Sequence, residues 1–371
     1  MTPARSLTPE SSWKELTFEA ATKAYEDAGV NVREDVESFI TCAEDYWEGF
    51  GIFDEFVPDQ LGAVMRPTCT ITGDGLQGLA AGAMQIESGL FDIVAVEAHS
   101  KASDILSYND IVLHSFDPIH EKPLGGHPYY VAGMEMEAFL RETGTSREPC
   151  AAIVEKNRIN ALANPWAAYG ANVTAEDVLA SEEWFTPLRR LEIARLADSA
   201  VVLVLASEKV APDLTEKPIW IRGLGWASDS PSLTNREWGR AKYAELAARK
   251  AFEQAGLGRA DIDFAEVDDQ FAYKEFQHLE AIGLAPKGEA PKMLEEGQFE
   301  VEGELPVNPS GGSLGVGNLL EANGLFKAAQ VTLQLRGEAG KNQVKGDVGL
   351  AQSWRGIPTN SGAVAILGVS R

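Results

Sequence analysis

The chain has 371 residues, of which 44% are hydrophobic and 24% are charged, and its formal net charge is −24. This length suits one large domain or two ordinary ones, and the composition is that of a globular protein with a sizeable core. The strong acidity argues against a uniformly basic face for nucleic acid.

The polar residue pattern gives no support for a metal site built from protein side chains alone. The three cysteines, Cys42, Cys69 and Cys150, are far apart, and no two of the five histidines have His-x-x-x-His spacing. The sequence has no apolar run of about 18 residues and no signal-peptide pattern at its start. We therefore expect a cytoplasmic protein that binds neither membrane nor nucleic acid.

The first part of the chain alternates between predicted helices and strands. Ser11 or Ser12 can cap a helix that ends at Gly29. The predicted elements are a helix at 13–28, strands at 36–42 and 67–71, a small-residue helix at 76–88, and strands at 91–97 and 200–206. An irregular aromatic segment is expected through Trp47 and Phe50. Between about 101 and 187, short helical pieces at 134–143 and 150–162 suggest an insertion that shapes a substrate site.

After a predicted linker at Lys217-Pro218, a second series of elements begins. It comprises a strand starting at 219–224, a helix at 238–255, a strand at 264–267, a helix at 273–282, a charged loop at 286–304, a helix at 319–335, and strands at 348–352 and 363–367.

An internal repeat is the strongest sign of how the chain is organised. Residues 23–29 are Lys-Ala-Tyr-Glu-Asp-Ala-Gly, and residues 250–256 are Lys-Ala-Phe-Glu-Gln-Ala-Gly. Each half then continues with a strand, a glycine-rich turn and a helix. We expect two similar α/β halves, 1–216 and 217–371, whose strand-to-helix turns surround one shared cleft.

The glycine-rich turn of the second half is Asn-Pro-Ser-Gly-Gly-Ser-Leu-Gly-Val-Gly-Asn, residues 308–318. Gly311, Gly312 and Gly317 would let backbone N–H groups approach a ligand closely, and the helix behind them would add unpaired N–H groups. This geometry suits an acyl or oxyanion group. The alternative is a tight strand-to-helix turn that binds nothing.

These features resemble the thiolase superfamily, in particular its sterol-carrier-protein-type and archaeal branch. The resemblance extends from about Trp13 to the end, and includes Ser-Gly-Leu-Phe-Asp at 88–92 and Gln-Leu-Arg-Gly-Glu-Ala-Gly at 334–340. It implies a duplicated, five-layer αβαβα fold with two mixed-sheet halves, a homodimer or homotetramer, and coenzyme A thioester substrates with no bound cofactor. It also implies carbon–carbon bond chemistry and a small zinc-ribbon/OB-fold partner subunit that binds acyl-CoA.

The catalytic positions that the resemblance implies carry other residues here. Thr72 stands at the position of the nucleophilic cysteine, and Cys69 lies three residues earlier. The family's His-Asp-x-Phe motif is Asp-Asp-Gln-Phe at 268–271, and its Gly-His-Pro is Gly-Asn-Leu at 317–319. A last acid/base position falls near Ser353, and the family's apolar first strand is missing before Trp13. A threonine hydroxyl does not readily replace a thiolate nucleophile.

Several residues remain candidates for the site, each with a structural alternative. Asn318 is favoured as an oxyanion donor in place of histidine. Of Asp268 and its neighbour Asp269, one is expected to exchange protons and the other to cap the helix from Tyr273. Cys69 is a nucleophile if the turn is shifted by a bulge, and otherwise a small buried side chain.

Two aromatic or heteroaromatic candidates complete the set. Tyr273 would donate a proton or pack in the core, and His127 of the insertion would reach the cleft or lie on a surface loop. Gly311, Gly312, Gly317 and Ser353 are expected to contact substrate. Three functions stay open: a thiolase-like acyltransferase, a cysteine-independent acyl-CoA retro-aldolase, and a non-catalytic acyl-CoA-binding or scaffold subunit.

Overall fold

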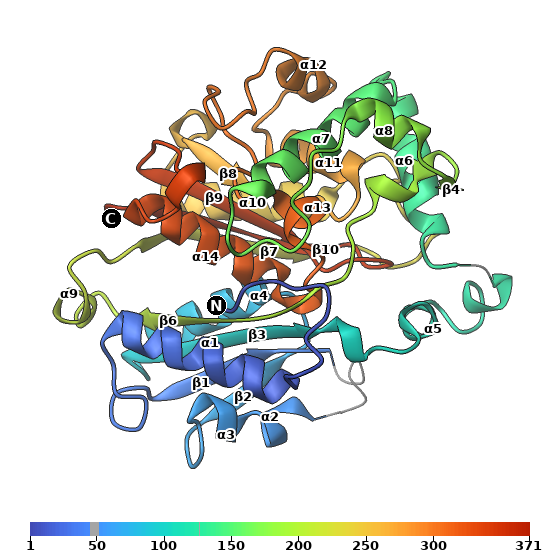
Figure 1. Ribbon diagram of the computed structural model, residues 1–371. Helices are drawn as coiled ribbons and strands as arrows, with labels where there is room; N and C mark the ends of the chain where they lie inside the picture. The colour runs from blue at the N-terminus through green and yellow to red at the C-terminus, as the bar shows by residue number, and fades with distance from the viewer. Residues whose placement is uncertain (45–51, 126) are drawn as a thin grey trace.

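The computed structural model describes residues 1–44, 52–125 and 127–371, and it contains two four-stranded sheets (Figure 1). Their strand orders are β2-β1-β3-β6 and β7-β10-β9-β8. β6 is antiparallel to β3, and β10 is antiparallel to both β9 and β7. The strands are β1 (Ser38–Cys42), β2 (Thr68–Ile71), β3 (Ile93–Lys101), β6 (Asp198–Ala206), β7 (Trp220–Ser228), β8 (Phe264–Glu266), β9 (Val348–Trp354) and β10 (Ser361–Gly368).

Helices form three layers around these sheets (Figure 1). α1 (Trp13–Ala28) covers the outer face of the first sheet, and α10 (Lys242–Ala255), with α11 (Ala272–Ile282) beside it, covers that of the second. α4 (Gly75–Glu87) and α14 (Asn323–Arg336) lie between the two sheets. The predicted five-layer αβαβα fold with two similar mixed-sheet halves is confirmed.

The repeated heptapeptide ends the equivalent helix in each half. In α1, Glu15 Oε2 accepts the backbone N–H of Ser12 at 2.7 Å, which fixes the start of the helix. Gly29 ends α1 with a φ of 66°, and Gly256 ends α10 with a φ of 65°. These left-handed residues favour glycine, so the Ala-Gly pairs predict both helix ends.

An insertion between β3 and β6 belongs to the first half in sequence but packs on the second. Its side chains Met136, Phe139 and Ile153 share one hydrophobic core with Tyr243 and Phe276. Its main elements are α5 (Tyr108–Leu113), α6 (Tyr130–Thr143), α7 (Glu148–Leu162), α8 (Ala175–Ala180), β4 (Glu183–Phe185) and β5 (Leu188–Arg189). The remaining short helices of the first half are α2 (Phe53–Phe56), α3 (Pro58–Leu61) and α9 (Ala211–Leu214).

Two predicted segments of the second half are built differently. The charged loop at 286–304 contains a helix, α12 (Ala290–Glu295). The helix predicted from 319 begins at Asn323 instead, and the glycine turn before it contains the short helix α13 (Gly312–Val316). The predicted irregular segment through Trp47 and Phe50 falls outside the described residues. Within the described ranges, no helix combines the length and apolarity needed to cross a bilayer.

Candidate functional site

The glycine turn closes around the carboxylate of Asp269. Ser313 N–H donates to Asp269 Oδ1 at 2.5 Å, and Leu314 N–H donates to Oδ2 at 3.2 Å. Gly311 and Gly312 have φ values of 106° and 56°, and a Cβ on Gly312 would lie 2.3 Å from Asp269 Oδ2. Glycine is therefore required for this approach. These two N–H groups at the start of α13 therefore bind a protein carboxylate, and substrate contact by Gly311, Gly312 and Gly317 stays a prediction.

A buried network of charged and amide side chains supports the turn. Asn157 Nδ2 lies 2.8 Å from Asp269 Oδ2 and 2.6 Å from Glu275 Oε2. Asn308 Nδ2 donates to Glu275 at 2.7 Å, and Lys156 Nζ lies 3.2 Å from Glu275 Oε1. Because an unpaired buried charge costs several kcal/mol, these pairings hold the turn in one conformation.

Asp268 has the electrostatic properties of an acid/base group. Its carboxyl is fully buried, and its two oxygens accept from Gln270 N–H at 3.1 Å and Gln270 Nε2 at 3.3 Å. Burial raises the pKa of Asp268 to about 6, although the Lys327 charge opposes this shift. A carboxyl with a pKa near neutrality exchanges protons readily at cellular pH. Of the two carboxylates, Asp269 caps α13 and not the helix from Tyr273, and proton exchange by Asp268 stays a prediction.

The backbone of Asp268 is held by His278, a residue that the sequence did not single out. His278 Nδ1 lies 2.8 Å from Asp268 O, and its Nε2 lies 2.8 Å from Tyr243 Oη. Burial lowers the pKa of His278 well below its usual value, so the ring is neutral. Since the carbonyl can only accept, Nδ1 carries the proton and Nε2 accepts from Tyr243.

Asn318 forms one buried cluster with Asp268 and Gln270, and hydrogen bonds fix the orientation of its amide. Asn318 Oδ1 accepts from Leu320 N–H at 3.0 Å and from Asn323 Nδ2 at 2.8 Å. Its Nδ2 therefore faces Gln270, whose Oε1 accepts at 3.3 Å. Gln270 in this way links Asn318 to Asp268.

The approach to Asn318 is closed by the segment that leads into β6. Gly317, with a φ of 123°, packs so tightly that an added Cβ would lie 2.6 Å from Ala197 Cβ. Asn318 N–H donates to Arg195 O at 2.7 Å. A cavity of about 10 Å³ behind the turn is lined by Ser310, Gly312, Gly317 and Lys327, among others. This space holds at most one water molecule.

Asp74 brings a carboxyl of the first half to the cluster, and sequence reasoning missed it. Its Oδ1 accepts from Leu76 N–H at 2.9 Å, and its Oδ2 accepts from Gly324 N–H at 2.9 Å. One side chain thus caps α4 and α14 together. Burial raises the pKa of Asp74 to about 6, while the adjacent Ser353 hydroxyl and the two N–H groups lower it. The Gly-Asp-Gly sequence signals a helix cap, but nothing in it indicates the partner 250 residues away.

Replacing Gly324 with alanine is expected to destabilise the protein by about 3 kcal/mol, because the new Cβ would lie 1.9 Å from Asp74 Oδ1. In an unobstructed helix the same change stabilises by about 1 kcal/mol. Urea unfolding measures the difference. The double variant Asp74→Ala/Gly324→Ala should recover part of the loss, and equal stability of Gly324→Ala and the parent would contradict the shared cap.

The two predicted nucleophile positions are at the end of β2 and within it. Thr72 is exposed beyond the end of β2, and Cys69 is half-buried within β2, opposite Ile40. Burial raises the pKa of the thiols of Cys69, Cys42 and Cys150. A raised pKa disfavours the thiolate form that a cysteine nucleophile needs. Among the described residues, no hydrogen bond links Thr72 or Cys69 to Asp74, Asp268 or Asn318.

Tyr273 and His127 have surroundings that differ from a reaction centre. Tyr273 is fully buried and donates to Glu135 Oε2 at 2.9 Å, and burial raises its pKa well above the usual value. His127 is half-buried, with its ring centroid 4.8 Å from that of Tyr129 and 4.7 Å from that of Phe185. The ring centroid of Tyr129 lies in turn 5.5 Å from that of Phe271, so His127 joins an aromatic layer that reaches Phe271. Tyr273 thus packs in the core, and His127 belongs to an aromatic layer of the insertion.

The remaining expectation concerns metal ions. In residues 1–44, 52–125 and 127–371, no group of three or more His, Cys, Asp or Glu side chains is arranged to hold a metal ion.

Ser353 is fully buried in β9 beside Asp74, so it contacts the cluster from the second sheet.

Comparison with known proteins finds a matching family and several relatives of this chain. Residues 225–369 match the family described as thiolase C-terminal domain-like. The chain is 32% identical over 351 residues to an acetyl-CoA acetyltransferase of Methanothermobacter thermautotrophicus, covering 92% of this chain and 91% of that protein. It is also 30% identical to sterol carrier protein 2 of Bos taurus, covering 68% of this chain and 47% of that protein, so it spans about half the length of that relative.

Solved structures share the complete fold. The structure titled Ltp2-ChsH2(DUF35) aldolase superposes with a TM-score of 0.86 at 23% identity, covering 100% of this chain and 96% of that chain. Human mitochondrial 3-ketoacyl-CoA thiolase superposes with a TM-score of 0.76 at 17% identity, covering 100% of this chain and 97% of that chain. From the full-length similarity to the archaeal acetyltransferase and the five-layer fold, the chain belongs to the thiolase family.

Proposed function

We propose that this protein cleaves or forms a carbon–carbon bond in an acyl-CoA thioester by a cysteine-independent, aldol-type reaction. The observation that carries the proposal is the pairing of Asp268, whose pKa is about 6, with the oriented amide of Asn318, in a chain whose three thiols all have raised pKa values. Family membership supports a thioester substrate. The aldolase named in the neighbouring structure supports this reaction class over thiolysis.

The reaction needs one base and one oxyanion donor. In the cleavage direction, the Asp268 carboxylate accepts the proton of the β-hydroxyl group of a β-hydroxyacyl thioester. The O–H electron pair forms a carbonyl, the bond between the α and β carbons breaks, and its electron pair becomes the enolate of the shortened thioester. Return of the proton to the α carbon completes the step. Neither coenzyme A nor water is consumed.

Asn318 would stabilise the enolate oxygen. One N–H of its amide is directed to Gln270, and the second has no partner in the part of the chain that the structure describes. A preoriented amide of this kind is a usable oxyanion donor although it is a poor base. Because Asn318 is only 5% exposed and Asp268 is fully buried, substrate entry requires the segment around Arg195 and Ala197, which closes the approach to Asn318, to move.

The direct test measures product formation by the purified protein from each of two substrates. A β-hydroxyacyl-CoA should yield a carbonyl product and a shortened acyl-CoA, whereas a β-ketoacyl-CoA with free coenzyme A should give no thiolysis. Thiolysis as the main activity would overturn the proposal. Tight acyl-CoA binding without turnover of either substrate would instead support the non-catalytic alternative.

Replacing Cys69 with alanine is expected to leave kcat and KM within about twofold of the parent values, since a thiol with a raised pKa contributes no nucleophile. Iodoacetamide treatment of the parent should have the same small effect. The matched control is Thr72→Ala, which removes the hydroxyl at the other nucleophile position. A loss of activity of a hundredfold or more in Cys69→Ala would restore the acyl-enzyme mechanism.

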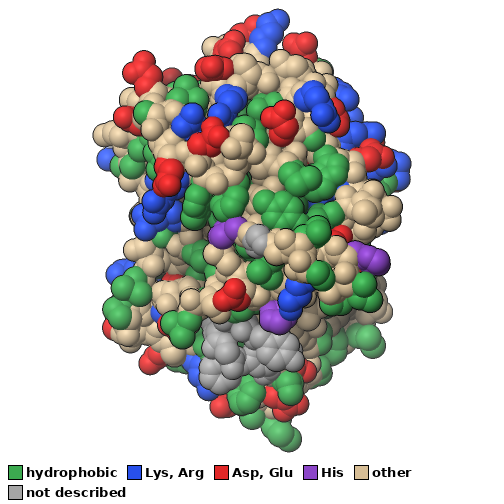
Figure 2. Space-filling view, turned by 90° about the vertical axis from the view of Figure 1, so that its right-hand side faces the viewer, with side chains coloured by type: hydrophobic (Ala, Val, Ile, Leu, Met, Phe, Trp, Pro, Cys, Tyr) green, Lys and Arg blue, Asp and Glu red, His purple; other side chains and the backbone are tan. Residues whose placement is uncertain are grey.

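We further propose that the protein works as a homodimer or homotetramer with a small zinc-ribbon/OB-fold subunit that binds acyl-CoA. The named neighbour that contains a DUF35 component supports this arrangement. The insertion also exposes apolar side chains, including Leu106, Ile119, Leu124 and Trp184. Figure 2 shows hydrophobic side chains gathered on the side of the molecule where the insertion lies. Co-expression with a candidate subunit, followed by light scattering, tests both the partner and the oligomeric state.

A further inference from the structure

Lys327 of α14 is a buried lysine that forms no ion pair with any described residue. Four lysines are buried in the part of the chain that the structure describes: Lys101, Lys156, Lys274 and Lys327. The first three each pair with a carboxylate. Lys327 is 4% exposed, and its Nζ donates to Ser313 Oγ at 3.0 Å. Because a buried charge without an opposite charge beside it is costly, Lys327 is a candidate for a functional role.

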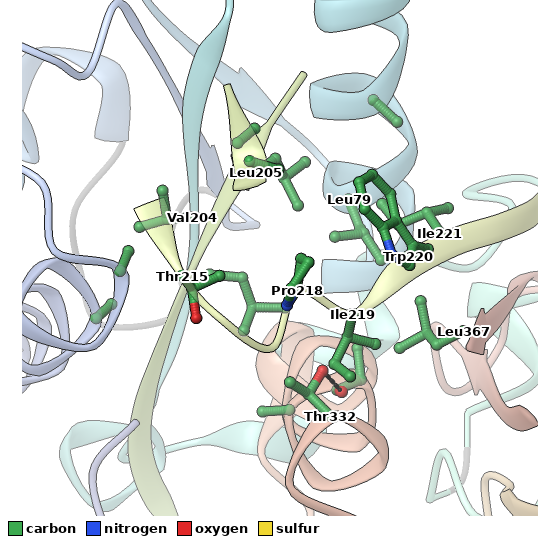
Figure 3. Close-up of a pocket in the computed structure, with 18 of the residues that line it drawn as sticks. Leu79, Val204, Leu205, Thr215, Pro218, Ile219, Trp220, Ile221, Thr332 and Leu367 are labelled. Carbon is green, nitrogen blue, oxygen red and sulfur yellow. Dashed lines mark hydrogen bonds between the residues drawn. The ribbon is translucent and has the colours of Figure 1, made fainter. Parts of the chain in front are cut away.

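The position of Lys327 on α14 encloses its charge between the two sheets. A helix has about 3.6 residues per turn, so Ala329, Thr332 and Arg336 lie on the side of α14 opposite Lys327. These three residues line an apolar groove of about 680 Å³, and Figure 3 shows Thr332 and Leu79 among the side chains around it. Lys327 borders instead the cavity of about 10 Å³ behind the glycine turn. Its ammonium group is therefore shielded from bulk water, and its field acts on nearby groups with little screening.

Three carboxyl groups lie close to Lys327, at the end of β8 and just after it. α14 packs against β8, which ends at Glu266, and Asp268 and Asp269 follow within three residues. Ser313, which accepts from Lys327, donates its backbone N–H to Asp269 Oδ1 at 2.5 Å. Burial raises the pKa of Glu266 to about 7, although hydrogen bonds and the Lys327 charge oppose this shift. At pH 7 Glu266 is therefore charged in only about half of the molecules and leaves part of the Lys327 charge uncompensated.

Asp268 is the carboxyl through which Lys327 would act on the reaction. Burial raises the pKa of Asp268, and the Lys327 charge is the strongest effect in the opposite direction. The other ionisable groups around Asp268 are Asp269 beside it, Asp74 at the start of α4, Tyr243 of α10, and Lys274 and His278 of α11. Lys274 pairs with Glu135 at 2.9 Å and His278 is neutral, so neither supplies an uncompensated positive charge. Among these described groups, Lys327 is the cation that stabilises the Asp268 carboxylate.

We propose that Lys327 is a positioning residue of the site, whose ammonium group holds Asp268 in the carboxylate form that acts as the base. This inference rests on the proposed function, in which Asp268 accepts the proton of the β-hydroxyl group. Lys327 lies behind the glycine turn, so it acts through the charge of Asp268 and does not touch the substrate. A base is most effective when its pKa lies near the working pH, and the Lys327 charge keeps most Asp268 side chains ionised at pH 7.

The first experiment compares the pH profile of kcat of the parent with that of Lys327→Met, using a β-hydroxyacyl-CoA as substrate. Methionine has a similar length without the charge, so the acidic limb should move from near pH 6 to about pH 7 or above. The loss in kcat should be about fivefold at pH 6 and should shrink as pH rises. Lys327→Arg keeps the charge and should bring the limb back toward pH 6. A limb that stays near pH 6 in Lys327→Met would overturn the proposal.

Lys156→Met is the matched control, because Lys156 is also 4% exposed but pairs with Glu275. This variant should lower Tm, since the buried Glu275 then lacks its partner cation. It should leave the acidic limb of the kcat profile near pH 6. If it moves the limb as far as Lys327→Met does, the effect belongs to any buried lysine and the proposal fails.

A second experiment needs no turnover, and it therefore separates this inference from the proposed reaction. Urea unfolding measures how much Asp268→Asn stabilises the parent and the Lys327→Met protein at a series of pH values. In the parent the gain should level off near pH 6, since the folded-state carboxyl is ionised above that pH. In Lys327→Met the gain should keep growing to about pH 7 or above, because folded Asp268 retains its proton to higher pH.

The two proteins together give distinct outcomes. A gain that levels off near pH 6 in both would overturn the inference, whatever the enzymatic activity. The expected difference, found in a protein that turns over no acyl-CoA substrate, would support the effect of Lys327 on Asp268 and refute the proposed reaction.

Discussion

Replacing Asp268 with asparagine is expected to lower kcat by about 10³-fold while making the folded protein more stable at neutral pH. Asparagine keeps an oxygen that can accept from Gln270 N–H, but it cannot take a proton from substrate. The buried carboxylate is also unfavourable, because burial raises its pKa from 3.8 to about 6. That difference lowers the free energy of unfolding by about 3 kcal/mol at a pH where Asp268 is ionised in both the folded and the unfolded protein.

The sign of the stability effect depends on pH. Between about pH 4 and pH 6 the folded protein holds a proton on Asp268 that the unfolded chain has released, so stability falls as pH rises. The stability advantage of Asp268→Asn should therefore be absent below about pH 4, grow up to about pH 6 and stay constant above it. Urea unfolding at pH 4 and pH 8 measures this. The parent's kcat should decrease below an apparent pKa near 6.

Asp269→Asn is the matched control, since the two carboxyls are adjacent and both fully buried. Asp269 accepts two N–H groups of α13, so its replacement should destabilise the protein at pH 8. A stabilised Asp269→Asn variant, or full activity in Asp268→Asn, would contradict the division of roles between the two residues.

Replacing Asn318 with alanine is expected to lower kcat by about 10²- to 10³-fold with a smaller change in KM. Its amide would bind the enolate oxygen most strongly as charge develops, so its loss raises the barrier more than it weakens substrate binding. The variant also loses the contact with Asn323, which a thermal unfolding curve will register separately. Steady-state kinetics with a β-hydroxyacyl-CoA provide the main readout.

Asn360 offers a matched control for this change. It is 7% exposed, close to the 5% of Asn318, and its Nδ2 donates to Ser230 O at 3.1 Å. Asn360→Ala should lower the free energy of unfolding about as much as Asn318→Ala does, and it should leave kcat nearly unchanged. An equal loss of kcat in both variants would show that Asn318 acts only through the fold.

The parts of the fold that were predictable are those with local signals. α1 was predicted with its observed bounds because a serine cap and a terminal glycine mark its two ends. The duplication was visible in the heptapeptide that ends α1 and α10. α12 was missed because its six residues lie in a charged, glycine-bearing segment whose pattern is too short to show helical periodicity.

For the candidate site, the sequence predicts single residues and not their contacts. Asn318 and Asp268 stay predictions as functional residues, and the structure links them through Gln270. The sequence predicts that one of the two carboxylates caps the helix from Tyr273, whereas Asp269 accepts N–H groups of α13, a distant segment that no local pattern indicates. Asp74 and His278 were missed because their partners come from segments that meet only in the folded chain.

The shared cap at Asp74 has a consequence for folding. The carboxylate completes the first turn of α4 from the first half and of α14 from the second. If the first half opens, the Gly324 N–H of α14 loses its buried acceptor, and if the second half opens, Asp74 Oδ2 loses the N–H group that it accepts. This hydrogen bond couples the stability of the two halves, so we expect them to unfold in one cooperative transition.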